Sequence, residues 1–213
     1  MKIEIWSDVA CPFCYIGKRR LEEALSTFEH KDEVEIEWKS YLLNPDMTTD
    51  ADKTLNEYLA ENKGWTKEYT QQVQGHVSDM AAEVGLEYHL DKAIPANTRQ
   101  AHNLIQLAKT KDKGEEMEEV LFKAYFTEGK NLDDVTTLVK LGTSIGLSAS
   151  DIEATLNNSA FNSSIEKDIY EGIQIGVKGV PFFVFDNRFG ISGAQPLEVF
   201  TRTLRQTHEE SQS

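Results

Sequence analysis

The chain has 213 residues, 39% of them hydrophobic, and a formal net charge of −14. This apolar content suffices for a globular core, whereas the acidic surface repels phosphate backbones and anionic membranes, so we expect no nucleic-acid partner and no docking on membranes. No stretch approaches the roughly 20 apolar residues of a membrane span, and no signal peptide is visible, so we expect a cytoplasmic protein.

The first 45 residues have the pattern of a strand, a helix and a second strand. Residues 2–7 and 34–41 alternate polar and apolar side chains, which is typical of strands. Residues 12–28 carry apolar side chains on one helical stripe, and Pro45 closes the unit. Its length suits a right-handed crossover between two parallel strands.

The middle of the chain, from about residue 50 to 157, shows helical patterns only. Four stripes of apolar residues indicate helices over 69–84, 101–108, 120–124 and 138–145. The segment Ser150–Glu153 resembles a capping box that opens a further short helix.

The last part of the chain returns to mixed structure. A helical pattern over 161–173 is followed by a buried-type strand over 180–185 and a second strand over 188–191. Asp186 and Asn187 suit the turn between them. Pro196 then opens a closing helix, and residues 208–213 are expected to form a polar tail.

This order predicts an α/β fold with a discontinuous α/β domain, 1–48 and 158–213. The stretch 49–157 is expected to form an inserted all-helical domain. The strand and helix patterns at the two ends of the chain predict one layered domain, because elements of these kinds bury their apolar faces against each other.

The chemistry-bearing motif is Cys11-Pro12-Phe13-Cys14, at the junction of the first strand and the first helix. Proline suits the first helical position, which makes Cys11 the N-cap. We expect a Cys11 thiolate to accept hydrogen bonds from the amides of Phe13 and Cys14 and to have a pKa below that of a free cysteine.

Cys14 lies one helical turn inward and is expected to be more buried and less ionised. Cys11 is then the attacking sulfur and Cys14 the resolving one. Lys18, one turn beyond Cys14, either adds weak positive potential or is an ordinary exposed helix residue. The motif therefore predicts a redox-active pair, although a passive buried pair is the alternative.

A structural zinc site is the other alternative for two cysteines, and it needs four ligands. The chain supplies no further cysteine, and its histidines show no ligand pairing in the sequence. They are His30, His76, His89, His102 and His208. We therefore expect no metal site.

The cysteine motif, together with Gly179-Val180-Pro181-Phe182, resembles the DsbA-like thioredoxin superfamily, and more narrowly its FrnE-like dithiol–disulfide isomerase subfamily. The resemblance covers essentially the whole chain. Supporting segments are Trp6-Ser7-Asp8, Trp38, Asn44-Pro45 and Asn97–His102. It implies a thioredoxin fold with a large inserted helical domain.

The resemblance also implies that Pro181 is a cis proline opposite Cys11. Val180 then presents its backbone to an extended substrate, and Pro12 and Phe13 join the substrate site. From the residues alone, a trans proline that starts a strand is the alternative. Phe13 stands where strongly oxidising members carry histidine, which implies a less oxidising pair.

His102 has two interpretations. The family comparison suggests that its helix faces the active site, where the imidazole would polarise a bound thiol substrate. The alternative is a packing histidine in a helical core.

Three functions follow. The first is a thiol–disulfide oxidoreductase or isomerase that acts on disulfide-containing proteins or small thiols, as a monomer or homodimer. It has no cofactor besides the Cys11–Cys14 disulfide, although glutathione is possible. The second is a glutathione-dependent enzyme of the 2-hydroxychromene-2-carboxylate isomerase or kappa-class transferase type, whose members usually carry serine where Cys11 stands. The third is a non-enzymatic, redox-switched binding protein.

Overall fold

The computed structural model describes residues 1–212, which divide into two compact units. Residues 1–43 and those from Glu166 onward form one, here called the sheet unit. Residues Asn44–Ile165 form the other, the helical unit. The inserted block expected over 49–157 lies inside the helical unit. This unit starts earlier because the Asn97 amide donates to the carbonyl of Met47, at 2.7 Å.

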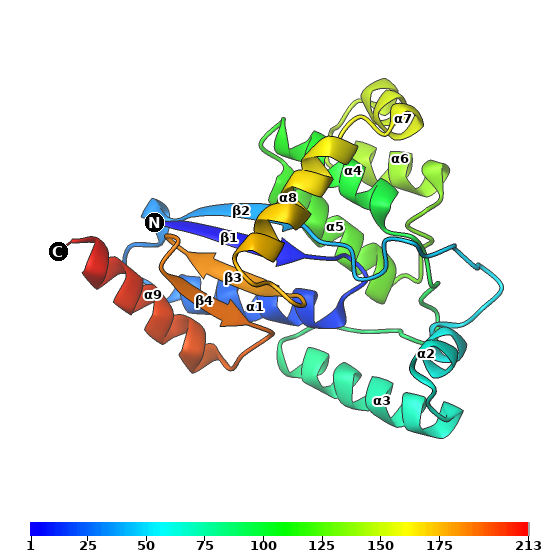
Figure 1. Cartoon of the computed structure of the whole chain (residues 1–213), viewed down its shortest axis with the longest axis horizontal. Coiled ribbons are helices and arrows are strands. Elements are labelled where there is room, and N and C mark those ends of the chain that lie inside the picture. The colour runs from blue at the N-terminus through cyan, green and yellow to red at the C-terminus, as the bar shows by residue number, and fades with distance from the viewer. Residues whose placement is uncertain (213) are drawn as a thin grey trace. The chain divides into compact units, whose positions relative to one another are not determined.

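The sheet unit contains a four-stranded mixed sheet (Figure 1). Its strands are β1 (Lys2–Ser7), β2 (Glu35–Ser40), β3 (Phe182–Phe185) and β4 (Phe189–Ser192), in the order β2-β1-β3-β4. The β1 and β2 strands are parallel, as the crossover pattern predicts, whereas β3 is antiparallel to β1 and to β4. This is a thioredoxin-type sheet.

The hairpin between β3 and β4 follows the turn chemistry of its sequence. Asp186 and Asn187 both have positive φ, 46° and 54°, as a two-residue hairpin turn requires. One prediction is wrong at the start of β3. Val180 and Pro181 precede the strand, because β3 begins to pair with β1 only at Phe182.

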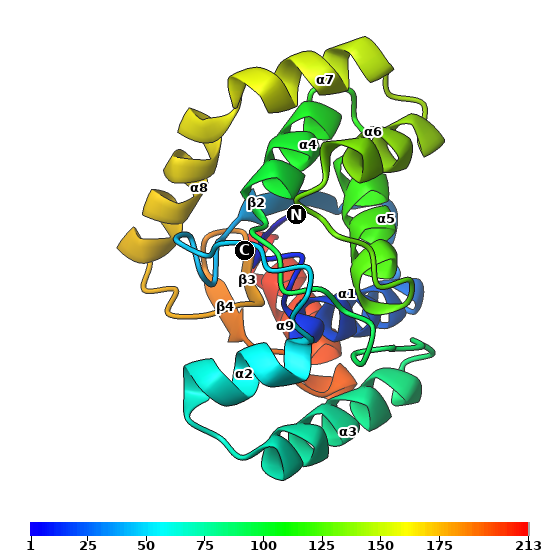
Figure 2. The ribbon, with the colours of Figure 1, turned by 90° about the vertical axis from the view of Figure 1, so that its right-hand side faces the viewer.

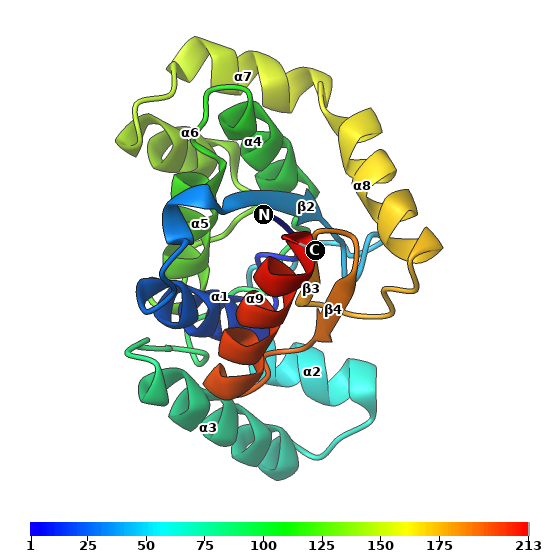
Figure 3. The same cartoon turned by 90° about the vertical axis from the view of Figure 1, so that its left-hand side faces the viewer.

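Three long helices accompany this sheet. Helices α1 (Pro12–Ser26) and α9 (Leu197–Ser211) pack against each other, and α9 also contacts β3 and β4 (Figure 3). The third helix, α8 (Asn162–Gln174), packs over β1, where the Trp6 indole donates to the Asp168 carbonyl at 2.7 Å.

The expected polar tail from His208 is wrong over the described residues, because α9 continues through Ser211. The last turn of this helix is held by a residue of the hairpin between β3 and β4. The Arg188 guanidinium donates to the carbonyl of Glu210 at 2.9 Å, so it satisfies a carbonyl that a helix end leaves open. Ser213 lies outside the described residues.

The helical unit has six helices within the described residues. They are α2 (Leu55–Lys63), α3 (Lys67–Glu83), α4 (Arg99–Lys109), α5 (Gly114–Phe126), α6 (Val135–Ser144) and α7 (Ala149–Asn158). Helix α4 contacts α5, α6 and α7, and α2 packs on α3 (Figure 2). The cap of α7 is Ser148, whose hydroxyl accepts from the Asp151 amide, so the expected cap at Ser150 is wrong.

No helix among residues 1–212 is both long enough and apolar enough to cross a membrane.

Candidate active site

The two cysteines lie where the chain passes from β1 into α1. Cys11 is the N-cap of α1 and Pro12 opens the helix, as the motif predicts. Both cysteines are free thiols and both are buried, Cys14 at 1% exposure and Cys11 at 4%. The pair therefore occupies the positive end of a helix, in a shielded position.

The Cys11 side chain does not accept the capping hydrogen bonds that the sequence predicts. Its thiol instead donates to the carbonyl of Val180, with Sγ and O 3.4 Å apart. The amide of Cys14 donates to the backbone carbonyl of Cys11, at 3.0 Å. A neutral thiol is a weak acceptor but carries a proton to donate, which explains why it turns to a carbonyl.

The Val180–Pro181 peptide bond is cis, and Pro181 is buried beside α1. Gly17 allows this close approach. A Cβ atom at Gly17 would lie 3.2 Å from Cγ of Pro181 and 3.0 Å from the Phe183 ring. Sequence reasoning missed Gly17, although a glycine inside a helix is itself a signal of close packing.

Asp8 holds the loop that leads from β1 to Cys11. One carboxylate oxygen accepts from the amide of Ala10 at 3.2 Å, and the other accepts from the amide of Leu43 at 2.8 Å. The Asp8 carbonyl accepts from the amide of Cys11 at 2.9 Å. The sequence indicated Asp8 only as part of a family motif, because its partner Leu43 is distant in the chain.

The thiol of Cys14 is held in its neutral form. Burial raises its pKa well above the usual value for cysteine, and the hydrogen bond and charge of Cys11 raise it further. The backbone of Asp8 opposes the shift but does not cancel it. Cys14 therefore suits the role of a resolving thiol that waits for a partner.

We expect alkylation to distinguish the two thiols in the reduced protein. At about pH 7, iodoacetamide should modify Cys11 roughly tenfold faster than Cys14, because only thiolates react and burial keeps Cys14 protonated. Labelling of Cys14 should rise only at a pH well above the range in which an ordinary cysteine ionises, because burial raises its pKa. Peptide mapping by mass spectrometry measures both rates, with the urea-unfolded chain as the control. Faster labelling of Cys14 in the folded protein would contradict these assignments.

Two other residues near the motif differ in exposure. Phe13 lies between the cysteines and is 37% exposed, which leaves an apolar ring at the surface. Lys18 is buried and forms an ion pair with Glu22, so its interpretation as an exposed helix residue is wrong. The reason is the i,i+4 carboxylate, which satisfies the ammonium group along the same face of α1.

His102 lies on α4 in the helical unit and is fully buried. Its predicted part in substrate binding stays a prediction.

Two other histidines lie next to each other, so the expectation that no histidines pair is wrong. The rings of His30 and His208 stack with centroids 3.7 Å apart, beside the carboxylate of Glu33.

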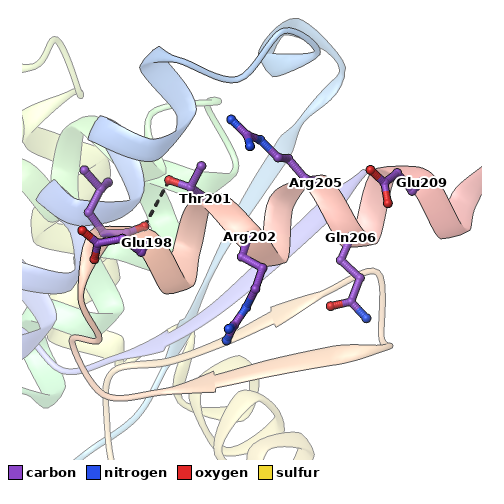
Figure 4. Close-up of a pocket in the computed structure, with 7 residues that line it drawn as sticks. Glu198, Thr201, Arg202, Arg205, Gln206 and Glu209 are labelled. Atoms are coloured by element: carbon purple, nitrogen blue, oxygen red, sulfur yellow. Dashed lines mark hydrogen bonds between the residues drawn. The ribbon is translucent and has the colours of Figure 1, made fainter.

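A hollow of about 620 Å³ lies along α9, and neither cysteine is part of its lining (Figure 4). It is lined by Leu197, Glu198, Thr201, Arg202, Arg205, Gln206 and Glu209. All of these residues belong to one helix, and Arg202 and Arg205 point to different sides of it (Figure 4). Such a face has no convergent polar groups, so it does not compete with the cysteine pair as a candidate site.

Comparisons with known proteins agree with this geometry. A family model described as a DSBA-like thioredoxin domain matches residues 2–205. A probable DsbA oxidoreductase from Streptomyces coelicolor is 36% identical, with a TM-score of 0.93 over 99% of this chain and 91% of its own. The uncharacterized protein YwbO of Bacillus subtilis is 29% identical over 213 residues, 95% of this chain and 94% of its own.

The cytosolic disulfide reductase DsbM from Pseudomonas aeruginosa has a similar fold. Its TM-score is 0.69 at 17% identity, over 98% of this chain and 99% of its own. At this level of identity the likeness concerns the fold alone.

Proposed function

Since the chain belongs to the family of DsbA-like thioredoxin domains, we propose that it exchanges disulfides with protein or small-molecule thiols. Cys11 and Cys14 carry the reaction. One observation supports this most directly. The Cys11 sulfur at the start of α1 contacts the Val180 carbonyl. It lies next to the thiol of Cys14, and burial raises the pKa of that thiol. Two sulfurs and a backbone acceptor thus lie together, which supports an attacking role for Cys11 and a resolving role for Cys14.

The reaction proceeds in two exchanges. In the first, the Cys11 thiolate attacks one sulfur of a substrate disulfide, a Cys11–substrate disulfide forms, and the other substrate sulfur leaves as a thiolate. In the second, the Cys14 thiolate attacks the Cys11 sulfur and releases the remaining substrate thiolate. The cysteine pair is oxidised by two electrons and the substrate disulfide is reduced. The reverse sequence oxidises a substrate dithiol.

The electrostatics of Cys14 support this order of steps. Part of the upward shift in its pKa comes from the hydrogen bond and charge of Cys11. Both contributions disappear once Cys11 forms a disulfide with the substrate, because the Cys11 sulfur then carries neither a proton nor a charge. The pKa of Cys14 therefore falls when its attack is needed, while burial protects it from reaction beforehand.

The substrate is best accommodated as an extended segment. The Val180 carbonyl is an acceptor that precedes β3, and the Cys11 thiol uses it in the reduced protein. When Cys11 gives up its proton, this carbonyl becomes available to a substrate amide. The exposed Phe13 ring offers an adjacent apolar contact. A backbone acceptor of this kind recognises an extended chain with little dependence on sequence.

A redox titration tests the proposal. In glutathione buffers, the wild type should show one reversible two-electron transition, with a potential below the about −120 mV of a strong oxidant, because Phe13 offers a thiolate no donor. The matched Phe13→His variant should be more oxidising, since a histidine there favours the thiolate. Trapping with a thiol reagent measures the oxidised fraction. A pair that never forms its disulfide would contradict the proposal.

A further inference from the structure

We propose that His30, Glu33 and His208 form a binding site for a single Zn²⁺ ion. One side-chain ligand atom from each residue lies within 4.8 Å of the others. The site belongs to the sheet unit but is remote from the cysteines. His30 and Glu33 immediately precede β2, whereas Cys11 follows the end of β1. Because β1 and β2 are parallel, the two sites lie at opposite ends of these strands.

Two of the ligands are aligned by local structure. A single 3₁₀ turn, η1 (Lys31–Glu33), follows His30. Side chains three residues apart in such a turn lie above one another, which brings the His30 ring and the Glu33 carboxylate together. Their Nδ1 and Oε1 atoms are 3.2 Å apart. The turn is fixed by a hydrogen bond from the amide of Glu33 to the carbonyl of His30, at 3.0 Å.

The third ligand, His208, belongs to α9, which lies far along the chain from His30. Helix α9 ends near the start of β1, as its red end close to the N-terminus in Figures 1 and 3 shows. His208 in its last turn stacks on His30, with an angle of 17° between the rings. The Phe28 ring packs in a T-shaped arrangement against both imidazoles, with centroids 5.8 and 6.0 Å away. The two rings are therefore held side by side by a shared apolar neighbour.

The donor set fits zinc. Two imidazole nitrogens and one carboxylate oxygen are common zinc ligands, and a water completes a tetrahedron. Tetrahedral bonds of about 2.1 Å place neighbouring ligand atoms about 3.4 Å apart, so the cluster must contract slightly from its 4.8 Å spread. The two rings must also turn so that their nitrogens converge. All three side chains are partly exposed, which leaves room for these rotations.

An ion pair alone does not account for the cluster. It explains why Glu33 lies beside His30, but it does not call for a second imidazole stacked on the first. A shared ion uses all three residues. Once bound, it would link the start of β2 to the end of α9, and this role does not depend on the proposed disulfide chemistry.

Calorimetric titration with ZnCl₂ tests the site in a chain that also carries Cys11→Ser and Cys14→Ser, so that neither thiol can act as a ligand. We expect one zinc ion per chain. Loss of an outer-shell partner already weakens metal binding about 10- to 100-fold, so His30→Gln and His208→Gln should each weaken it at least about tenfold. The matched control is His89→Gln, because His89 also lies 3.2 Å from a glutamate, Glu87, but belongs to no three-residue ligand cluster among residues 1–212.

Two further readouts decide the outcome. At saturating zinc the melting temperature should rise by about 5 °C in this serine-substituted chain and in its His89→Gln variant, but not in its His208→Gln variant. Melting temperatures in EDTA should be equal for all variants, which shows that each one folds. No saturable binding by the serine-substituted chain would overturn the proposal. Binding that is unchanged in His30→Gln and His208→Gln would also overturn it.

Discussion

We expect the Cys11→Ser variant to lose disulfide reduction almost completely, with a fall of at least about 1000-fold in insulin turnover. A serine hydroxyl is not ionised near neutral pH and forms no disulfide, so the first exchange cannot occur. The loss should appear in the initial rate of insulin reduction with glutathione as the electron donor. Serine is nearly the size of cysteine, so the packing around the N-cap is preserved.

The Cys14→Ser variant should fail at a different step. Cys11 remains available to attack, but the covalent Cys11–substrate disulfide has no internal thiol to resolve it. We expect this adduct to accumulate as one substrate per chain, visible by mass spectrometry without reductant and lost when excess thiol is added. Cys11→Ser should form no such adduct.

The two variants together make the assignment of roles testable. Equal turnover of the wild type and both variants would reject dithiol chemistry. An adduct in Cys11→Ser but not in Cys14→Ser would reverse the roles of the two cysteines. His89→Gln, in the helical unit, serves as a control for substitution itself and should leave turnover unchanged.

The core of this site was readable from the sequence because it is local. A strand pattern, two cysteines, an intervening proline and a helical stripe all lie within the first 28 residues. They correctly predict that Cys11 is an N-cap and that Cys14 is the more buried thiol. The hydrogen-bond partner of Cys11 was wrong, because Val180 lies far along the chain and no local pattern links the two.

The same distinction separates the other successes from the failures. Thr54 and Glu57 form a capping box at the start of α2, and Gly64 is its left-handed C-cap. These local signals mark both ends of α2, although no apolar stripe predicted the helix. The stacking of His30 on His208 carried none, because it depends on how α9 packs. Long-range contacts of this kind depend on the tertiary fold rather than on spacing.

The second large effect is expected at Asp168, a buried residue of α8. Its carboxylate accepts from the amide of Ser40 at 3.0 Å and lies 3.7 Å from the ammonium group of Lys39. Ser40 ends β2, an edge strand of the sheet, so Asp168 satisfies an outward-facing amide there. One side chain thus joins the edge strand to the helix that covers it.

Asp168→Ala should lower the free energy of unfolding by about 3 kcal/mol, because it removes a buried ion pair and deprives the Ser40 amide of this acceptor. The ammonium group of Lys39 still forms ion pairs with the carboxylates of Glu37 and Glu171, at 3.1 Å each, so its charge remains paired. Urea unfolding followed by tryptophan fluorescence measures the change, since Trp6 donates to the Asp168 carbonyl. Asp168→Asn should recover part of the loss, because an amide oxygen can accept from Ser40.

Glu171→Ala is the matched control, because it removes a different partner of the same lysine. The Glu171 side chain is 37% exposed, and such pairs contribute about 0–1 kcal/mol. Equal losses in Asp168→Ala and Glu171→Ala would mean that surface charge, rather than the hydrogen bond to the edge strand, holds α8 in place.

The contribution of Lys39 to stability depends on pH. Burial lowers the pKa of Lys39, but hydrogen bonds to Glu37 and Glu171 outweigh this effect and leave the pKa raised. The stability that Lys39 contributes is therefore complete below about pH 10.4 and is lost as the pH rises further.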